Sequence, residues 1–208
     1  MQRRQKINIE ILKLPNASRL DEFDALANDK DITLRFINAR EEIGSPELFI
    51  IPGTSKTIQD YIYLKRTGYS DKIRELAKKK VAIMGISGGF QMLGAKIIDI
   101  KGSEMLHSRC EGFSFLSMVT RLMPSKVEDD VEAMLLKNNC KVHGYESHIG
   151  RTKYLNGLEP MFTITKRGGI DVEIPDGAVN EDGKIFGTYI HGLFINTKFK
   201  DTFLSKLQ

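Results

Sequence analysis

Short apolar runs alternate with segments of helical spacing along the first half of the chain. Strands are predicted at residues 7–14, 33–37, 48–51 and 81–86. Helices are predicted at residues 18–27, 57–65, 70–79 and 88–93. Two of these helices begin with a capping-box pattern, Ser18 with Asp21 and Thr57 with Asp60. Strands that alternate with helices are typical of a parallel, doubly wound α/β sheet.

The second half of the chain is less regular. Further strands are predicted at residues 113–121, 141–148, 161–166 and 184–190, with fewer helices between them. Residues 197–207 suit a closing amphipathic helix with Phe199, Phe203, Leu204 and Leu207 facing inward. Because there is no repeat, linker or low-complexity segment, we expect residues 1–208 to form one α/β domain. Its sheet is expected to be mostly parallel, doubly wound and flanked by helices.

Composition excludes several classes of protein. The net charge of the 208 residues is only +4, and the basic residues are scattered, so nucleic-acid binding is not expected. No apolar run approaches the roughly 20 residues that span a bilayer, and none follows the basic start as in a signal peptide. The two cysteines give no disulfide framework, and the four histidines are too dispersed for a metal site. We therefore expect a cytoplasmic protein without membrane contact or metal.

The most informative segment is Gly-Ile-Ser-Gly-Gly at residues 85–89, after the apolar run 81–86. A strand that turns sharply into a helix presents one side chain beside free backbone N–H groups. Gly85 and Gly89 leave room where the strand and the helix approach each other. Ser87 is therefore the candidate nucleophile and the Gly88 N–H a candidate oxyanion donor. A plain strand-to-helix turn is the alternative interpretation.

Three further motifs carry chemically useful groups. Pro-Gly-Thr-Ser-Lys-Thr at residues 52–57 follows a buried strand, where parallel sheets bind ligands, and Gly53 offers a second N–H. It lacks the spacing of a phosphate-binding loop. His191, in Gly-Thr-Tyr-Ile-His-Gly-Leu-Phe at residues 187–194, is the candidate general base. The segment 144–152 gathers Tyr145, Glu146, His148 and Arg151 on one predicted strand and its exit.

These four motifs, in this order, resemble the glutamine amidotransferase domain of cobyric acid synthase, a branch of the class I or triad glutaminases that also contains cobyrinic acid diamide synthase. The N-terminal segments 14–18 and 23–26 also fit, so the resemblance covers nearly the whole chain. It implies a function in cobalamin biosynthesis, in which ammonia released from glutamine passes to an ATP-dependent synthetase. No cofactor is expected.

The resemblance also implies roles for individual residues. In such enzymes a thiolate attacks the glutamine side-chain amide, a histidine transfers protons, and two N–H groups stabilise the oxyanion. Carried over, Ser87 takes the nucleophile position and His191 the base. Gly53 and Gly88 form the oxyanion hole. The glutamine pocket is expected to include Gln91, Tyr145, His148 and Arg151.

The chain departs from the family pattern at three points. Ser87 stands where the family has cysteine, and a hydroxyl is far less ionised near neutral pH than a thiol. No glutamate lies two residues after His191, so Glu146 is the candidate for orienting the base. The synthetase is expected to be a separate domain or subunit, docked on a rim formed by residues 54–57, Phe90 and residues 148–152. We therefore expect the glutaminase reaction to be impaired.

Other functions remain open at this point. The Gly-x-Ser-x-Gly pattern also fits a serine hydrolase, with Asp171 or Asp176 as the acid. A non-catalytic protein that binds glutamine or a partner would keep the same pocket. The amidotransferase subunit of a lipid II amidating complex is a sibling with a separate ligase.

Overall fold

A computed structural model describes residues 6–104 and 108–207. Its centre is a six-stranded sheet in the order β11-β12-β4-β3-β1-β2. Every neighbouring pair is parallel except β11 with β12. Its strands are β1 (Ile7–Lys13), β2 (Ile32–Asn38), β3 (Leu48–Ile51), β4 (Ala82–Ile86), β11 (Ala178–Val179) and β12 (Ile185–Thr188).

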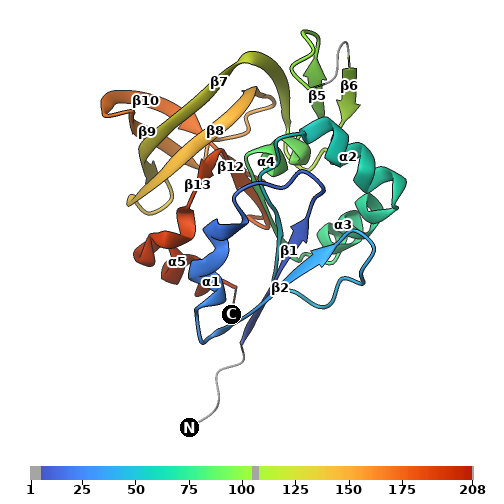
Figure 1. The fold of residues 1–208 in the computed structure, drawn as a ribbon. Coiled ribbons are helices and arrows are strands. Elements are labelled where there is room, and N and C mark those ends of the chain that lie inside the picture. Colours follow the sequence, from blue (N-terminus) through green and yellow to red (C-terminus); the bar gives the residue numbers. More distant parts are fainter. Residues whose placement is uncertain (1–5, 105–107, 208) are drawn as a thin grey trace.

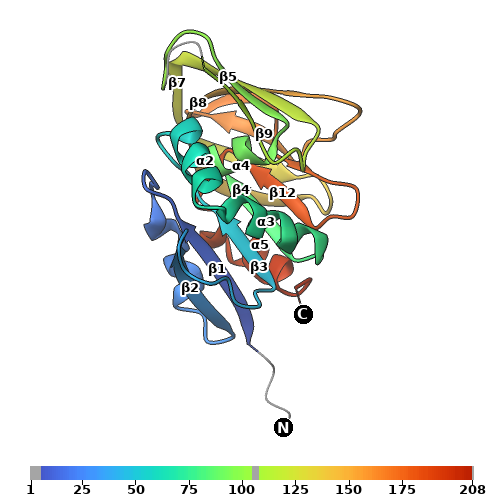
Figure 2. The same cartoon turned by 90° about the vertical axis from the view of Figure 1, so that its right-hand side faces the viewer.

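Helices cover both faces of this sheet (Figures 1 and 2). Alternate residues of β3 show why: Phe49 and Ile51 belong to one apolar cluster, Leu48 and Ile50 to the other. The first cluster contains side chains of α2 and α3, and the second contains side chains of α1 and α5. The helices are η1 (a 3₁₀ helix, Leu20–Phe23), α1 (Asp24–Ala27), α2 (Thr57–Arg66), α3 (Tyr69–Lys78), α4 (Gly88–Leu93), η2 (Leu193–Ile195) and α5 (Thr197–Leu204).

A second, largely antiparallel sheet lies beside the carboxyl ends of the central strands (Figure 1). A long hairpin of β7 and β8 dominates it, and β13 pairs with β8. Because β13 follows β12 almost directly, the chain passes from the first sheet to the second between residues 188 and 190. The strands are β5 (Lys96–Asp99), β6 (Ser108–Glu111), β7 (Met118–Leu135), β8 (Cys140–Tyr154), β9 (Phe162–Arg167), β10 (Ile170–Asp176) and β13 (Ile190–His191).

The predicted α/β class is confirmed: the four strands predicted in the first half of the chain, and most of the one predicted at 184–190, lie in the parallel part of the central sheet. The second sheet was not predicted as a separate layer, because its strands were expected to be much shorter than β7 and β8. The capping boxes are wrong: neither η1 nor α2 has a side-chain cap. Thr57 instead donates to the side chain of Gln91, and the Asp60 carboxylate binds Asn16 and Thr54.

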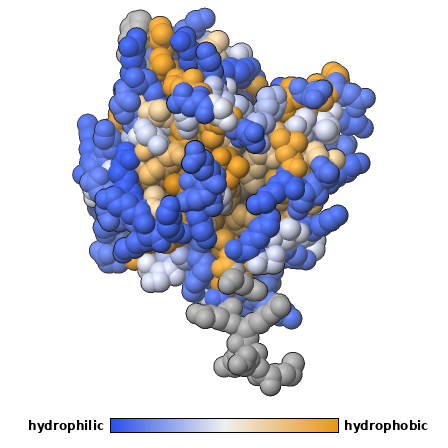
Figure 3. Space-filling model, turned by 180° about the vertical axis from the view of Figure 1, so that it is seen from behind, coloured by the Kyte–Doolittle hydropathy of each residue, from blue (hydrophilic) through white to orange (hydrophobic). Residues whose placement is uncertain are grey.

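Hydrophilic residues cover most of the surface seen from behind, while apolar side chains gather near its centre and also reach its upper edge (Figure 3). In the part of the chain that the structure describes, no helix is long and apolar enough to cross a membrane. The first five residues of the basic start, for which no signal peptide is expected, lie outside the described residues. Cys110 and Cys140 are buried free thiols.

Candidate active site

Ser87 stands on a sharp bend between β4 and α4. Its φ of 50° and ψ of −111° are rare for a residue with a side chain, a strain that is common at functional sites. The Ser87 N–H donates to the Thr188 carbonyl of β12 at 2.8 Å. A Cβ on Gly89 would lie 2.0 Å from the Ile51 carbonyl oxygen, so no side chain fits where the helix starts. The bend has the features of a nucleophile elbow.

His191 is held by a carboxylate that the sequence analysis did not single out. Its Nδ1 lies 2.9 Å from Oε1 of Glu22, and the other carboxylate oxygen accepts the Gly192 N–H at 2.9 Å. The side chains of His191 and Glu22 are only 4% and 6% exposed. A carboxylate only accepts hydrogen bonds, so it fixes the proton on Nδ1 and leaves Nε2 as the acceptor. This is the tautomer that a general base needs.

Glu146 does not orient His191, contrary to the sequence prediction. In the β8–β13 pair Glu146 lies opposite Ile190, and Tyr145 lies opposite His191. Successive side chains of a strand point to opposite faces, so Glu146 faces away from the base. Its carboxylate binds Nε2 of His148 at 3.2 Å and the Arg167 guanidinium at 2.6 Å. Burial raises its pKa, but the His148 hydrogen bond and the Arg167 charge hold the pKa below its ordinary value.

A pocket of about 320 Å³ brings the candidate catalytic groups together. Five of the predicted residues line it: Ser87, Gly88, Gln91, His148 and His191. The lining residues that the sequence analysis missed include Arg19, Glu104, Lys126 and Glu128, while Thr57 and Ser147 belong to predicted motifs but were given no role in the pocket.

The other predicted pocket residues lie around this lining. Arg151 is exposed, and its guanidinium donates to the Gly150 carbonyl. The Tyr145 hydroxyl donates to Glu128 at 2.6 Å, and its ring lies 4.4 Å from the Arg19 guanidinium. Tyr145 therefore supports two residues that line the pocket. Gly53 lies directly against the His191 ring: a Cβ added to Gly53 would be 2.7 Å from Cε1 of that ring.

Gln91 is buried at the base of the pocket, with both ends of its amide occupied. Thr57 donates to its carbonyl oxygen at 2.9 Å, and its NH₂ group donates to the Tyr189 hydroxyl at 3.3 Å. The His148 ring stacks on Tyr189 with ring centroids 3.8 Å apart. This network links α2 and α4 to β8 of the second sheet and thereby fixes one wall of the pocket.

Charged groups of both signs surround the pocket. Arg19 and Lys126 bring cations, and Glu128 pairs with Lys126 at 2.9 Å. Glu104 accepts the Ile58 N–H at 2.9 Å, and burial raises its pKa above the ordinary value. Among the described residues, no cluster of three or more acidic, histidine or cysteine side chains could hold a metal ion.

Near Ser87, Gly88 is the first residue of α4, where N–H groups have no partner within the helix. A Cβ on Gly88 would lie 2.5 Å from a methyl group of Thr54, so the Gly53–Thr54 turn closes over the elbow. The Ser87 hydroxyl donates to the Ser147 carbonyl at 3.2 Å. The arrangement places the candidate nucleophile Ser87, the candidate base His191 and the start of α4 at Gly88 in one pocket.

Three sequence expectations fail for physical reasons. Phe90 has no exposed surface and packs edge-on against Tyr189 with centroids 5.3 Å apart, so it cannot form part of a docking rim. Asp171 is exposed, and the Asp176 carboxylate binds Thr188 and the Tyr189 N–H. Neither aspartate therefore orients the base as a serine hydrolase of the predicted order would require.

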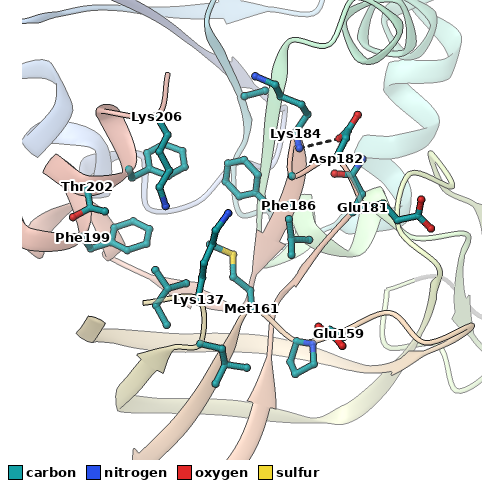
Figure 4. A pocket seen from close by; sticks show the side chains of 18 of the residues that line it. Lys137, Glu159, Met161, Glu181, Asp182, Lys184, Phe186, Phe199, Thr202 and Lys206 are labelled. Atoms are coloured by element: carbon teal, nitrogen blue, oxygen red, sulfur yellow. Dashed lines mark hydrogen bonds between the residues drawn. The ribbon is translucent and has the colours of Figure 1, made fainter. Parts of the chain in front are cut away.

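A larger cavity of about 810 Å³ lies near the opposite ends of the same strands, where Ala82 and Lys184 line it. Phenylalanine side chains of α5 and β12 line it together with Lys137, Lys184 and Lys206 (Figure 4). It contains none of the predicted catalytic or binding residues, so the smaller pocket is the candidate active site.

Comparisons with family models and with known proteins point to the same family. Residues 8–199 match the family described as CobB/CobQ-like glutamine amidotransferase domain. A cobyric acid synthase of Clostridium botulinum (strain Kyoto / Type A2) is 39% identical over 204 residues, which are 97% of this chain and 41% of that protein. A cobyric acid synthase of Clostridium acetobutylicum is 38% identical over 98% of this chain and 40% of its own length. The chain thus spans about two fifths of these relatives.

Solved structures with low sequence identity share the fold. PurLQS from Thermotoga maritima superposes with a TM-score of 0.71 at 18% identity, over 98% of this chain and 100% of that chain. A crystal structure of a glutamine amidotransferase superposes with a TM-score of 0.68 at 15% identity, over 96% and 97% of the two chains.

Proposed function

This chain belongs to the family of CobB/CobQ-like glutamine amidotransferase domains, and from that premise we propose that its pocket hydrolyses the side-chain amide of glutamine. The observation that carries the proposal is the joint placement of Ser87, on a strained elbow, and His191, held by Glu22, in one pocket. A nucleophile and a base that is itself oriented by a third group form the pattern of covalent acyl transfer.

The proposed reaction has two halves. The Ser87 hydroxyl turns from Ser147 toward His191, and its oxygen attacks the amide carbon while Nε2 takes the proton. The N–H groups of Gly88 and Gly53 stabilise the oxyanion. The imidazolium protonates the departing nitrogen, so ammonia leaves and a glutamyl ester forms. Water, deprotonated by His191, then cleaves the ester to glutamate and restores Ser87.

The pocket is suited to a free amino acid because it carries both signs of charge. We propose that the cations Arg19 and Lys126 lie toward the α-carboxylate and that Glu104 lies toward the α-ammonium group. His148 and Gln91 would form the wall along the side chain. Tyr145 would act indirectly, through Arg19 and Glu128, and the exposed Arg151 would lie at the mouth.

The hydroxyl of Ser87 limits the rate in this proposal. A serine depends on its base for every proton, whereas a thiolate is populated beforehand and is intrinsically more nucleophilic. The ammonia would pass to an ATP-dependent synthetase, as the name cobyric acid synthase of the longer relatives suggests. That synthetase activity, and with it a role in cobalamin biosynthesis, is proposed for the partner domain or subunit.

The test is ammonia release from glutamine by the chain and by Ser87→Cys, with Ser87→Ala as the background. We expect the cysteine form to release ammonia and the serine form to stay near the alanine background. A His191→Ala change in the cysteine form should abolish the release. If the serine form equals the cysteine form, the site is adapted to serine and the proposed impairment is wrong. If the cysteine form neither releases ammonia nor is labelled at residue 87 by an electrophilic glutamine analogue, the proposed reaction is wrong.

A further inference from the structure

A buried carboxylate outside the catalytic motifs binds the segment that carries the base. Asp176 is the last residue of β10 and is only 2% exposed. One of its oxygens accepts the Thr188 hydroxyl, and the other accepts the Tyr189 N–H at 3.1 Å. Among the described residues, no cation forms an ion pair with it. A buried carboxylate without a counter-charge is costly, so its position calls for a reason.

Thr188 connects this carboxylate to both partners of the catalytic pair. Its carbonyl accepts the Ser87 N–H at 2.8 Å, and its hydroxyl oxygen accepts the Ile190 N–H at 3.0 Å. His191 is the next residue. Figure 1 shows β12 and β13 following one another here, where the chain changes sheets. Asp176 therefore binds the bend at residues 188–189. This bend contacts the Ser87 N–H through the Thr188 carbonyl and leads directly into His191.

We propose that Asp176 is a positioning residue for the catalytic pair: its two hydrogen bonds fix the 188–191 bend and thereby the relative placement of Ser87 and His191. The inference rests on the proposed function of the pocket. Asp176 does not touch the substrate in this proposal. It acts only through the backbone and hydroxyl of Thr188 and the N–H of Tyr189.

The direction of the hydrogen bonds explains why an acid stands here. An ionised Asp176 has no proton to donate, so the Thr188 hydroxyl, which accepts from the Ile190 N–H, donates its one proton to residue 176. A carboxylate accepts both the hydroxyl and the Tyr189 N–H. An asparagine can accept only with its oxygen. In one orientation its NH₂ group faces the Thr188 hydroxyl, whose proton loses its acceptor. In the other orientation the NH₂ group faces the Tyr189 N–H, so two donors oppose each other.

The experiment measures steady-state ammonia release in the Ser87→Cys form. Adding Asp176→Asn should lower kcat by about tenfold or more, because small displacements of catalytic groups are costly. The KM for glutamine should change by less than about threefold, since no contact to the substrate is removed. The matched control is Tyr154→Phe, which deletes a partly buried hydrogen bond to the neighbouring Gly177 carbonyl. Its kcat should stay within about twofold of the parent.

A second pair of variants covers the case in which Asp176→Asn does not fold. Thr188→Ser keeps the hydroxyl and should keep kcat, whereas Thr188→Val removes it and should lower kcat as Asp176→Asn does. Equal kcat values for Thr188→Ser and Thr188→Val would overturn the proposal, provided that the melting temperatures show both variants to be folded at the assay temperature.

A readout without turnover separates this inference from the proposed function. In the unaltered chain, the His191 ring resonances report its hydrogen bond to Glu22, and Asp176→Asn should shift or broaden them while Tyr154→Phe leaves them in place. If the Ser87→Cys form neither releases ammonia nor is labelled at residue 87 by an electrophilic glutamine analogue, the proposed function fails, but this measurement still tests the positioning. Unchanged His191 resonances in Asp176→Asn would refute the positioning role, whatever the activity.

Discussion

Replacing Glu22 by glutamine tests the least expected part of the site. The change keeps the shape of the side chain but leaves one acceptor where the carboxylate has two, for the His191 ring and the Gly192 N–H. If the amide oxygen stays with Gly192, the NH₂ group faces Nδ1. The ring must then carry its proton on Nε2, where it cannot accept one from residue 87. If the amide turns round, the NH₂ group opposes the Gly192 N–H.

The size of the effect follows from these two arrangements. A hydrogen bond to a charged group contributes about 1.5–3 kcal/mol, and each 1.4 kcal/mol is about tenfold in rate, so losing one gives a loss of about 10- to 150-fold. A ring locked in the wrong tautomer costs more, about 10⁴-fold in a serine protease triad. In the Ser87→Cys form we therefore expect Glu22→Gln to lower kcat by at least about tenfold.

The assay is ammonia release under saturating glutamine, with melting temperatures to confirm folding. Glu146→Gln is the matched control, because Glu146 is a second buried carboxylate that binds a histidine, but on the other face of β8. We expect it to retain at least ten times the kcat of Glu22→Gln. A folded Glu22→Gln form within twofold of its parent, or an equal loss in both variants, would refute the assignment of Glu22.

Further outcomes follow from burial and close packing. Gly89→Ala should lower the free energy of unfolding by about 3 kcal/mol or more, because its Cβ would lie 2.0 Å from the Ile51 carbonyl; an unchanged urea midpoint would contradict this. Phe90→Glu should prevent folding, since it buries an unpaired charge, while Phe90→Leu should fold; normal circular dichroism of the glutamate form would contradict this. Burial, together with the nearby charge of Glu146, raises the pKa of Asp176 to about 7, well above its ordinary value. Burial, with the charge of Asp176 as a further cause, also raises the pKa values of Tyr154 and Tyr189. A raised pKa favours the folded state in acid, so the parent should lose stability relative to Asp176→Asn between about pH 4 and 7, by up to about 1.4 kcal/mol per pH unit. A stability difference between the parent and Asp176→Asn that does not vary with pH would contradict the raised pKa of Asp176.

Local signals made the central sheet predictable. The run at 48–51 is apolar on both faces and ends at Pro52-Gly53, which suits a strand between two helical layers. The glycines around Ser87 indicated the elbow, and in the structure Gly85 and Gly89 lie where the backbone of a neighbouring element approaches closely. Such features depend on a few consecutive residues, so they can be recognised in the sequence without knowledge of the rest of the fold.

Contacts between distant segments were not predictable in the same way. Glu22 and His191 are 169 residues apart, and Glu22 sits in an acidic stretch that resembles an ordinary helix start. The Thr57 hydroxyl fits a helix cap by pattern, yet it binds Gln91 of another helix. Glu146 was chosen because it shares a short motif with His148, but the register of β8 turns it away from the base. Register and sheet packing, not residue type, decided these assignments.

Glu22 also sharpens the question of why a serine occupies the elbow. A thiolate–imidazolium pair needs the carboxylate mainly to hold the ring, because charge separation precedes the attack. A serine needs it during the attack itself, when the imidazolium forms beside the developing oxyanion. If the site were adapted to serine, Glu22→Gln would cost more in the serine form than in Ser87→Cys, and an activated ester would show it even where amide turnover is slow. In the proposed glutaminase the serine form has little rate to lose, so the cost appears in the cysteine form. The two backgrounds together therefore distinguish an adapted serine enzyme from an amidotransferase site whose nucleophile is weak.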